Sequence, residues 1–328
     1  MRTVYINEFG AVDNLEFSEV PNPPKPNGVQ VLIRVRAAGL NRADLLQVRG
    51  LYPPPALYSP NMPGLEFAGE IAAVGEAVGK WNIGDRVFGI TAGEGQAEFL
   101  LTDASLIAGV PANLEFAEAA AVPEAFITAH DAIFTLGELK VNETLLIHAV
   151  GSGVGLAALQ LAKARGADVI GTSRTSEKLQ KCVEFGLDSP ISTGDGINFA
   201  DPAKEKTSGK GVNVILDLVG GAYFQENLAG LAMQGRLILV GLTSGRTAEF
   251  DLGIALQKRA RIIGTTLRGR SIEEKAEATR RFTDEVVPLL ASGEVVPNVD
   301  RVFAAADVVK AYEYLESNAS FGKVVLEF

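Results

Sequence analysis

Two patterns of apolar residues divide the chain. Up to about Asp103, short runs of β-branched and other apolar residues alternate with turn residues, which is typical of β-strands. The clearest runs are Val29–Val35, Gly69–Val74, Asp85–Ile90 and Ala97–Leu101. From Pro123 onward, strand-like apolar runs alternate with segments whose apolar residues recur at helical spacing. The first part is therefore predicted to be mostly β, and the second to consist of βαβ units.

The second part contains enough strand candidates for a complete doubly wound sheet. They are Thr144–Ala149, Ala167–Thr172, Ser189–Ser192, Val212–Leu218, Arg236–Val240 and Arg261–Leu267. Helical segments at 154–165, 176–185, 222–231 and 251–258 lie between most of them. Strands joined by helical crossovers form parallel sheets, so we predict an α/β fold with a doubly wound parallel sheet of the dinucleotide-binding type.

The residues after Leu267 exceed what such a sheet needs. They read as a charged amphipathic helix (Ile272–Ser292), a strand (Val299–Phe303), a second helix (Ala306–Glu316) and a terminal strand (Lys323–Phe328). We expect this segment to return and complete the first domain. A solvent-exposed helix face without chemistry is predicted for Glu273, Glu274, Lys275, Glu277, Arg280 and Arg281.

Composition narrows the class of protein. With 328 residues, 47% of them hydrophobic and 21% charged, the chain is long and apolar enough for two packed domains. A net charge of −10 argues against nucleic acid and anionic membrane surfaces as partners. A single cysteine, Cys182, excludes an internal disulfide and a multi-thiolate zinc site. No signal-peptide pattern or long apolar segment is seen, so we expect a cytoplasmic protein.

A glycine-rich turn follows the strand at Thr144–Ala149 and opens a helix. The turn contains Gly151, Ser152, Gly153, Val154 and Gly155. Unpaired N–H groups at a helix N-terminus attract anions, and glycine allows a pyrophosphate to approach the backbone. In this strand–turn–helix context, the turn predicts a dinucleotide-binding loop.

The end of the next strand indicates which dinucleotide is bound. Sites for NAD place an acidic residue there to bind the ribose 2′-hydroxyl, whereas a 2′-phosphate needs small and basic groups. Here Ser173 stands in place of the acid and Arg174 follows it. Lys178 lies one helical turn further on, as a second phosphate contact or as part of a solvated helix face. The segment therefore favours NADPH.

At this point the chain resembles the zinc-independent quinone oxidoreductase branch of the medium-chain dehydrogenase/reductase superfamily, in particular the p53-inducible type. The motifs that carry the resemblance span the chain. They are Ala38–Leu45, Gly50–Pro55, Pro63–Gly69, Gly84–Val87, Ala120–Ala129 and the glycine-rich turn.

The resemblance implies a split architecture. A GroES-like β-barrel substrate domain at 1–122 and 268–328 would flank a Rossmann NADPH-binding domain at 123–267, with the active site in the cleft between them. Relatives commonly pair through the edge of the Rossmann sheet, here near Arg261–Leu267, so a homodimer is expected. The turn departs from the family pattern at Val150, where a small residue is usual.

The resemblance also indicates whether the chain could bind a catalytic zinc ion. The zinc alcohol dehydrogenases of this superfamily have a cysteine where Asn41 stands and a histidine where Leu65 stands. Since neither ligand is present and the chain has only two histidines, we expect no metal. Hydride delivery to an electron-poor acceptor, such as a quinone, is then favoured over alcohol oxidation.

Two residues are candidates for the chemistry. Tyr52, in a proline-rich loop, could donate its phenolic hydrogen to a quinone oxygen or stack on the ring, or could simply pack on the prolines. Ser152 aligns with a functionally important serine of the family, but could also be no more than a small residue in a tight turn.

Further cofactor contacts are suggested by resemblance. Asn41 could bind the nicotinamide end or cap a loop, and Thr128 could contact the nicotinamide or bond its own helix backbone. The other candidates are Asn198, Val240, Gly241, Leu242, Leu267 and Arg268. A place on a dimer surface is an alternative for Arg268 and Arg270. His148 is predicted to be a satisfied buried histidine, and Cys182 an inert thiol.

Two other functions stay open. A reductase of activated C=C bonds, such as those of enals or enones, would have the same cofactor site. A non-enzymatic protein that binds NADPH as a structural or RNA-binding factor is also conceivable, although the net charge and the lack of a basic run argue against RNA.

Overall fold

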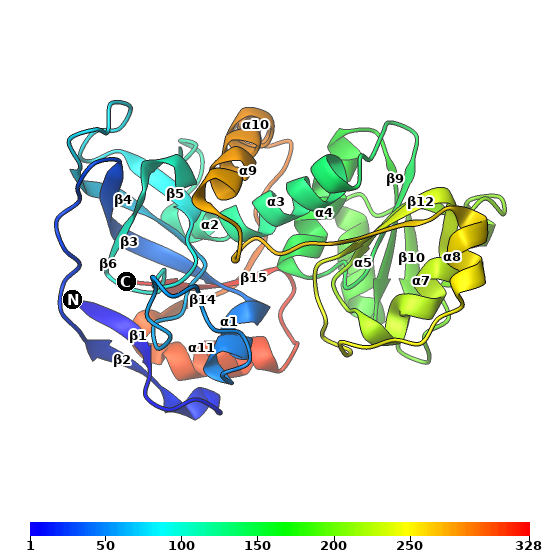
Figure 1. Cartoon of the computed structure of the whole chain (residues 1–328), viewed down its shortest axis with the longest axis horizontal. Helices are drawn as coiled ribbons and strands as arrows, with labels where there is room; N and C mark the ends of the chain where they lie inside the picture. Colours follow the sequence, from blue (N-terminus) through cyan, green and yellow to red (C-terminus); the bar gives the residue numbers. More distant parts are fainter. The chain divides into compact units, whose positions relative to one another are not determined.

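The computed structural model describes all 328 residues, which divide into two compact units. The first unit comprises Met1–Ile127 and Leu267–Phe328, and the second comprises Thr128–Thr266. Helix α3 (Pro123–His130) contains the first boundary. Figure 1 labels the elements, and each unit is described by itself below.

The first unit is built on a seven-stranded sheet around the long strand β3 (Gln30–Leu40). The sheet runs β14 (Val299–Ala304), β15 (Lys323–Glu327), β3, β4 (Glu66–Val74), β5 (Arg86–Ile90) and β7 (Ile107–Gly109), and β6 (Phe99–Asp103) also pairs with β3. Because β15 pairs antiparallel with β3, the predicted return of the C-terminal segment is confirmed. Strands β1 (Arg2–Ile6) and β2 (Leu15–Glu19) form a separate hairpin sheet.

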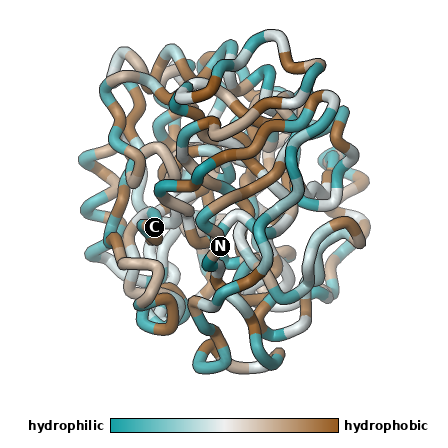
Figure 2. The backbone as a smooth tube through the Cα atoms, turned by 90° about the vertical axis from the view of Figure 1, so that its left-hand side faces the viewer, coloured by the Kyte–Doolittle hydropathy of each residue, from teal (hydrophilic) through white to brown (hydrophobic).

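Apolar alternation explains how this sheet buries one face. Val31, Ile33 and Val35 of β3 are buried together with Phe67 and Ile71 of β4. Figure 2, coloured by hydropathy, shows short hydrophobic stretches alternating with hydrophilic ones along the chain. A second apolar cluster packs α1 (Arg42–Val48) and α11 (Val308–Glu316) against β1 and β15.

The helices of the first unit differ in part from the prediction. The short helix α1 lies in the region up to Asp103 that is predicted to be mostly β, and α2 (Phe116–Ala120) lies between the two predicted regions. The predicted helix at 272–292 is broken into α9 (Ile272–Glu285) and α10 (Val287–Ser292). The break has a local cause, because Pro288 has no backbone N–H to continue the helical hydrogen bonds.

The second unit is a six-stranded, wholly parallel sheet. Its order is β10 (Ser189–Ser192), β9 (Asp168–Ser173), β8 (Thr144–Ile147), β11 (Val212–Asp217), β12 (Leu231–Leu239) and β13 (Arg261–Gly264). In chain order this is 3-2-1-4-5-6, so the predicted doubly wound α/β fold is confirmed. The strand order reverses between β8 and β11, and ligands of such sheets bind at the carboxyl ends of the strands there.

Helices complete the second unit. They are α4 (Gly153–Ala164), α5 (Ser176–Glu184), α6 (Ala200–Lys206), α7 (Phe224–Gly230), α8 (Leu252–Lys258) and a π-helix at Asp131–Leu136. Short 3-10 turns occur in the two units at Val12–Asn14, Ala104–Leu106, Gly221–Tyr223 and Ala305–Asp307. Strand β12 begins at Leu231 and not at Arg236 as predicted, because an irregular stretch precedes the regular pairing.

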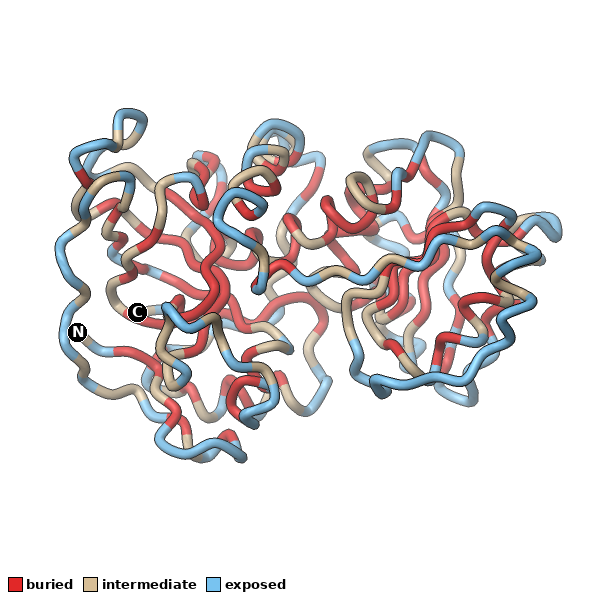
Figure 3. The backbone as a smooth tube through the Cα atoms, in the orientation of Figure 1, coloured by how far each residue is buried: buried red, intermediate tan, exposed pale blue.

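The buried residues lie mainly in the central strands of the two sheets. In Figure 3 the central strands of each unit are largely red, for buried, and many connecting loops are pale blue, for exposed. The edge strands β13 and β14 are mostly exposed. Residues 242–253 form the longest continuous exposed segment, and lead into α8.

Candidate active site

The predicted cofactor loop forms between β8 and α4. Ser152 is the N-cap of α4, and its Oγ accepts a hydrogen bond from the backbone N–H of Gly155 at 3.2 Å. A side chain at position 155 has no room, because a Cβ there would lie 2.6 Å from the carbonyl oxygens of Ala149 and Val150. The turn is therefore packed tightly against the first turn of the helix, which is the arrangement an anion-binding helix N-terminus requires.

Val150 fits into this loop because its neighbour lacks a side chain. Val150 is fully buried, and a Cβ added to Gly171 of β9 would lie 2.8 Å from its Cγ1. The Val150 N–H donates to the Thr172 carbonyl at 3.1 Å, so the loop is also bonded to β9. The departure from the family pattern at Val150 is thus compensated by glycine at position 171.

The end of β9 lies beside this loop. Ser173 is the last residue of the strand, Arg174 follows it and is exposed, and Lys178 is half-buried on α5. The Ser173 hydroxyl accepts from the Thr175 N–H at 3.3 Å, so it shapes the turn in which Arg174 lies. No carboxylate occupies the last position of β9, and the guanidinium is available at the same sheet edge as the glycine-rich loop.

The other predicted cofactor contacts lie at several places in the second unit. Val240 and Gly241 directly follow β12, but their N–H groups donate to the Asp217 carbonyl at 2.9 and 3.2 Å. Leu242 and Asn198 are exposed in loops. The hydroxyl of Thr128 is buried without a hydrogen-bond partner, and such an orphaned group fits a contact with a polar group of a bound cofactor.

His148 is the buried, satisfied histidine that the sequence predicts. Its Nε2 lies 2.6 Å from Asn227 Oδ1, and its Nδ1 lies 2.8 Å from Thr172 Oγ1. Since Asn227 donates its amide to Asp217 at 2.8 Å, its oxygen must accept from His148, so the proton is on Nε2. Burial lowers the pKa of His148, and the neutral ring orients the strand ends without acid–base chemistry.

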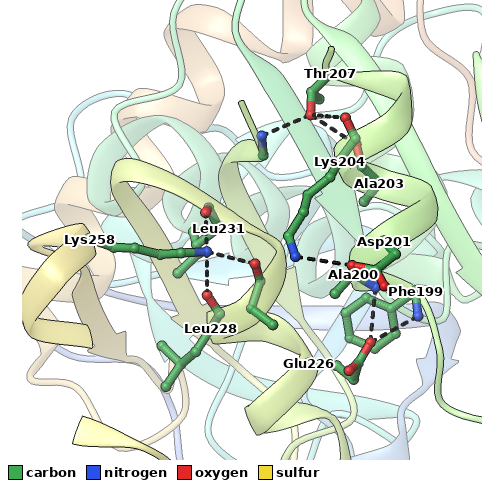
Figure 4. Close-up of polar contacts among 12 residues, drawn as sticks. Phe199, Ala200, Asp201, Ala203, Lys204, Thr207, Glu226, Leu228, Leu231 and Lys258 are labelled. Atoms are coloured by element: carbon green, nitrogen blue, oxygen red, sulfur yellow. Dashed lines mark hydrogen bonds and ion pairs between the residues drawn. The ribbon is translucent and has the colours of Figure 1, made fainter. Parts of the chain in front are cut away.

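Helix α7, which carries Asn227, is fixed at both ends (Figure 4). Glu226 accepts from the N–H groups of Phe199 and Ala200 at 3.2 and 3.0 Å. At the other end the Lys258 ammonium donates to three carbonyls of the last turn and beyond it, those of Leu228, Ala229 and Leu231.

Cys182 needs no functional explanation. It is buried on α5, and burial raises the pKa of its thiol to about 12. The thiolate form is therefore scarce, as the prediction of an inert thiol requires.

In the first unit, a buried ion pair organises the polar groups around Asn41. The Lys323 ammonium donates to Glu66 Oε1 at 2.5 Å and to Asn41 Oδ1 at 2.7 Å. The Asn41 amide donates to the same Glu66 oxygen at 2.8 Å. Both polar atoms of Asn41 are thus engaged within the protein, and Asn41 is also the N-cap of α1, where Asp44 accepts its backbone N–H at 2.8 Å.

Asp44 is the second buried carboxyl of this region. It accepts from the N–H of Gly64 at 3.3 Å and from Gln96 at 3.4 Å, and Tyr312 donates to the other end of Gln96 at 2.8 Å. Burial raises the pKa of Asp44 to about 6, and this effect exceeds the lowering by its hydrogen bond and by the nearby cations. We find no sequence signal that distinguishes Asp44 from an ordinary helix-start aspartate.

Arg268 holds Tyr52 by both its backbone and its ring. The guanidinium donates to the Tyr52 carbonyl at 2.8 Å, and its carbon lies 5.0 Å from the centre of the Tyr52 ring. It also donates to Ala92 O at 2.8 Å and to Gln47 Oε1 at 2.5 Å. Arg268 is only 4% exposed, so the alternative of a dimer-surface position is wrong for this residue. Leu267 beside it is buried as well.

Tyr52 is half-buried in this clamp. Burial raises the pKa of its phenol, and the positive charge of Arg268 acts in the opposite direction. The phenol therefore stays protonated near neutral pH and is a fixed hydrogen-bond donor.

The prediction that Lys275 lies on the solvent-exposed face of α9 is wrong. The residue lies on the buried face of the helix with Ala278, Thr279 and Phe282, and only 5% of it is exposed. This face follows the i, i+3, i+4, i+7 spacing, which is the signal in the sequence that could have placed Lys275 inward.

No group of three or more His, Cys, Asp or Glu side chains is arranged to hold a metal ion. None of the helices combines the length and the apolar character needed to cross a membrane.

Comparison with known proteins bears on the whole chain. Residues 27–131 match the alcohol dehydrogenase GroES-like domain, and residues 153–284 match the zinc-binding dehydrogenase family. The quinone oxidoreductase of Pseudomonas aeruginosa is 33% identical, over 97% of this chain and 97% of that protein. The chain belongs to the quinone oxidoreductase branch of the medium-chain dehydrogenase/reductase superfamily. Erythronolide synthase EryA2 of Saccharopolyspora erythraea is 35% identical over 97% of this chain, which spans 8% of that protein's length.

Solved structures show the same fold. Escherichia coli quinone oxidoreductase, complexed with NADPH, has a TM-score of 0.88 and 30% identity, with all of both chains covered. The JamJ enoyl reductase has a TM-score of 0.89 and 28% identity, over 99% of this chain and 98% of that one. The first unit is thus the GroES-like domain of this family, and the second is its Rossmann domain.

The fit of Val150 against Gly171 predicts a specific stability effect. Gly171→Ala should lower the free energy of unfolding by about 1–3 kcal/mol, because the new methyl group overpacks against Val150 and Leu187. Adding Val150→Ala should restore part of the loss. Urea unfolding of both variants measures this, with Gly109→Ala as a control at a strand glycine of β7 that has open space. Equal losses for the control and Gly171→Ala would contradict the explanation.

Proposed function

We propose that this protein catalyses the NADPH-dependent, zinc-free reduction of quinones. The observation that carries the proposal is the end of β9, where Ser173 and Arg174 replace the acidic residue of an NAD site in a chain of the quinone oxidoreductase family. The absence of cysteine and histidine at Asn41 and Leu65 supports the zinc-free mechanism. The single cysteine is free and buried, which is compatible with a location in the reducing cytoplasm.

The residues of the Rossmann domain would hold the cofactor. Gly151, Gly153, Val154 and the Ser152-capped start of α4 would take the pyrophosphate, and Arg174 the 2′-phosphate. Lys178 would add positive charge from α5, and Thr128 would satisfy its buried hydroxyl on the nicotinamide side. Asn198, Val240, Gly241 and Leu242 are further candidate contacts. NADPH, when bound, supplies the hydride.

The GroES-like domain would hold the acceptor. A quinone is already electrophilic, so the protein has to position the ring and stabilise negative charge on an oxygen. Tyr52 would donate its hydrogen bond to that oxygen, and Arg268 would hold Tyr52 in place. Asn41, whose polar atoms are engaged with Glu66 and Lys323, would act by fixing this part of the domain.

A second candidate is reduction of activated C=C bonds, favoured by the structural similarity to enoyl reductases. It differs in its chemistry, because a hydride added at the β-carbon of an enal leaves the α-carbon to be protonated. Quinones need no such proton transfer to carbon.

Acceptor preference and the role of Tyr52 can be tested together. Chelator-treated protein should consume NADPH with 9,10-phenanthrenequinone or 1,4-benzoquinone faster than with trans-2-hexenal, as followed by NADPH absorbance. Tyr52→Phe should lower quinone kcat by about tenfold, the value of one lost hydrogen bond, with the Kd for NADPH unchanged. Turnover with hexenal alone would favour the second candidate, and unchanged kcat would make Tyr52 a packing residue.

Cofactor choice should depend on Arg174. Arg174→Ala should raise the Kd for NADPH by about tenfold or more, since a charge-assisted contact to the 2′-phosphate is lost. The Kd for NADH should change little. Fluorescence titration of both cofactors measures the difference, and Lys181→Ala on α5 serves as a control. An equal loss for both cofactors would contradict the assignment.

We also propose that the protein is a homodimer that pairs through β13. This strand is the edge of the Rossmann sheet, and Ile262 on it is exposed, as are Leu252 and Leu256 on α8. Ile262→Lys should convert the dimer to monomers, as measured by light scattering, whereas Val183→Lys at an exposed position on α5 should not. A monomeric wild type would overturn this proposal.

A further inference from the structure

Gln47 is a buried amide that is bonded at both its oxygen and its nitrogen. It lies on α1 and is 1% exposed. Its Oε1 accepts from Arg268 at 2.5 Å, and its Nε2 donates to the carbonyls of Pro60 at 2.8 Å and Met62 at 3.4 Å. Because a guanidinium only donates and a carbonyl only accepts, the amide fits here in one orientation. Gln47 is therefore a fixed link between Arg268 and the chain at Pro60.

This link closes the base of the loop that carries Tyr52. Arg268 donates to the Tyr52 carbonyl at 2.8 Å, and its guanidinium carbon lies 5.0 Å from the centre of the Tyr52 ring. Through this one guanidinium, Gln47 joins the first residue of the segment 52–60 to its last residue, Pro60. Surface loops whose ends are held together in this way are compact and frequently functional.

The second half of the loop is fixed by residues that follow β5. The Ser59 N–H donates to Glu94 Oε1 at 2.7 Å. Tyr58 packs over Gly93, where an added Cβ would lie 3.0 Å from the Tyr58 Cβ. By contrast, Leu57 is 89% exposed. The loop is thus held at its two ends and open to solvent between them.

The choice of side chains at the base indicates more than packing. A buried guanidinium and a buried amide lose their contacts with water, so apolar residues would hold a loop at a lower cost of desolvation. What the polar pair adds is direction, because the guanidinium bonds the Tyr52 backbone while it contacts the ring. A catalytic donor has to lie within about 2.6–3.2 Å of its acceptor, and a displacement of about 1 Å can lower the rate about a hundredfold.

We propose that Gln47 is a positioning residue for the reduction: by holding the Arg268 guanidinium and the Pro60 carbonyl together, it sets the direction in which the Tyr52 phenol donates to the acceptor oxygen. The inference rests on the proposed function. It adds a residue that is itself buried and acts through Arg268.

A double-mutant cycle tests this role. Gln47→Met keeps the length of the side chain and removes its hydrogen bonds, so it should lower quinone kcat by about five- to tenfold and leave the Kd for NADPH unchanged. In the Tyr52→Phe background, the same substitution should lower kcat by less than about twofold, because the phenol on which Gln47 acts is already absent. Equal factors in the two backgrounds, or an unchanged kcat in Gln47→Met, would overturn the inference.

Two further variants show whether the effect is specific. Gln47→Glu keeps an oxygen for the guanidinium and should retain at least about a third of the wild-type kcat. Gln30→Met removes a half-buried amide of the same domain, which accepts from the Asn27 N–H at 3.2 Å, and should leave kcat unchanged. Thermal unfolding reports whether each variant folds. If Gln47→Glu loses as much activity as Gln47→Met, Gln47 does not act through Arg268.

Hydrogen exchange provides a readout that needs no acceptor. In Gln47→Met, the backbone amides of the segment 51–62 should exchange faster by about threefold or more, and those of β14 at an unchanged rate. Unchanged exchange in the segment 51–62 would overturn the inference. If exchange is faster but the wild type reduces no quinone, the proposed function alone is overturned, and the cycle is then measured with trans-2-hexenal.

Discussion

The GroES-like domain depends on one carboxylate that has no access to water. Glu66 of β4 is bonded by Lys323 from β15, by Asn41 at the start of α1 and by the N–H of Glu124 at the start of α3. Four segments distant in the sequence thus meet at one charge, and removing one charged partner of such a buried pair typically costs about 3–5 kcal/mol. Burial, together with the charge of Glu66, raises the pKa of Glu124 to about 8, whereas Lys323 opposes this effect.

Each domain has a buried network of hydrogen-bonded polar groups. In the Rossmann domain, Asp217, Asn227, His148 and Thr172 form a continuous series of hydrogen bonds that fixes the carboxyl ends of the strands. That network satisfies the imidazole at both nitrogens, so His148 has a structural role. In the GroES-like domain, Glu66, Lys323 and Asn41 form a second buried network. Both networks satisfy charged or polar groups that are removed from water, and both thereby stabilise their domain.

The periodic parts of the fold could be predicted from the sequence, and the polar clusters could not. All six Rossmann strands and the return of the C-terminal strand follow from apolar patterns, because those patterns reflect which face is buried. The burial of Arg268 and Lys275 could not be predicted in this way, because charged residues are normally exposed and only the packing of distant segments shows that these two are buried. The spacing of Ala278, Thr279 and Phe282 does mark the inner face of α9, on which Lys275 lies. The compensation between Val150 and Gly171 likewise depends on the pairing of β8 with β9.

Direct hydride transfer to a quinone is the central claim, and an isotope effect tests it most directly. Single turnovers of chelator-treated protein with 1,4-benzoquinone would be followed by stopped flow, using NADPH deuterated at either the pro-R or the pro-S position of C4. The account predicts slower oxidation with one of the two labelled cofactors and an unchanged rate with the other, because a protein that binds the cofactor in one orientation transfers from one face. Mass spectrometry of the NADP+ formed identifies the label that is lost. Equal loss of deuterium from both labelled cofactors would contradict the account, because a cofactor bound in one orientation gives up the hydrogen of one face only.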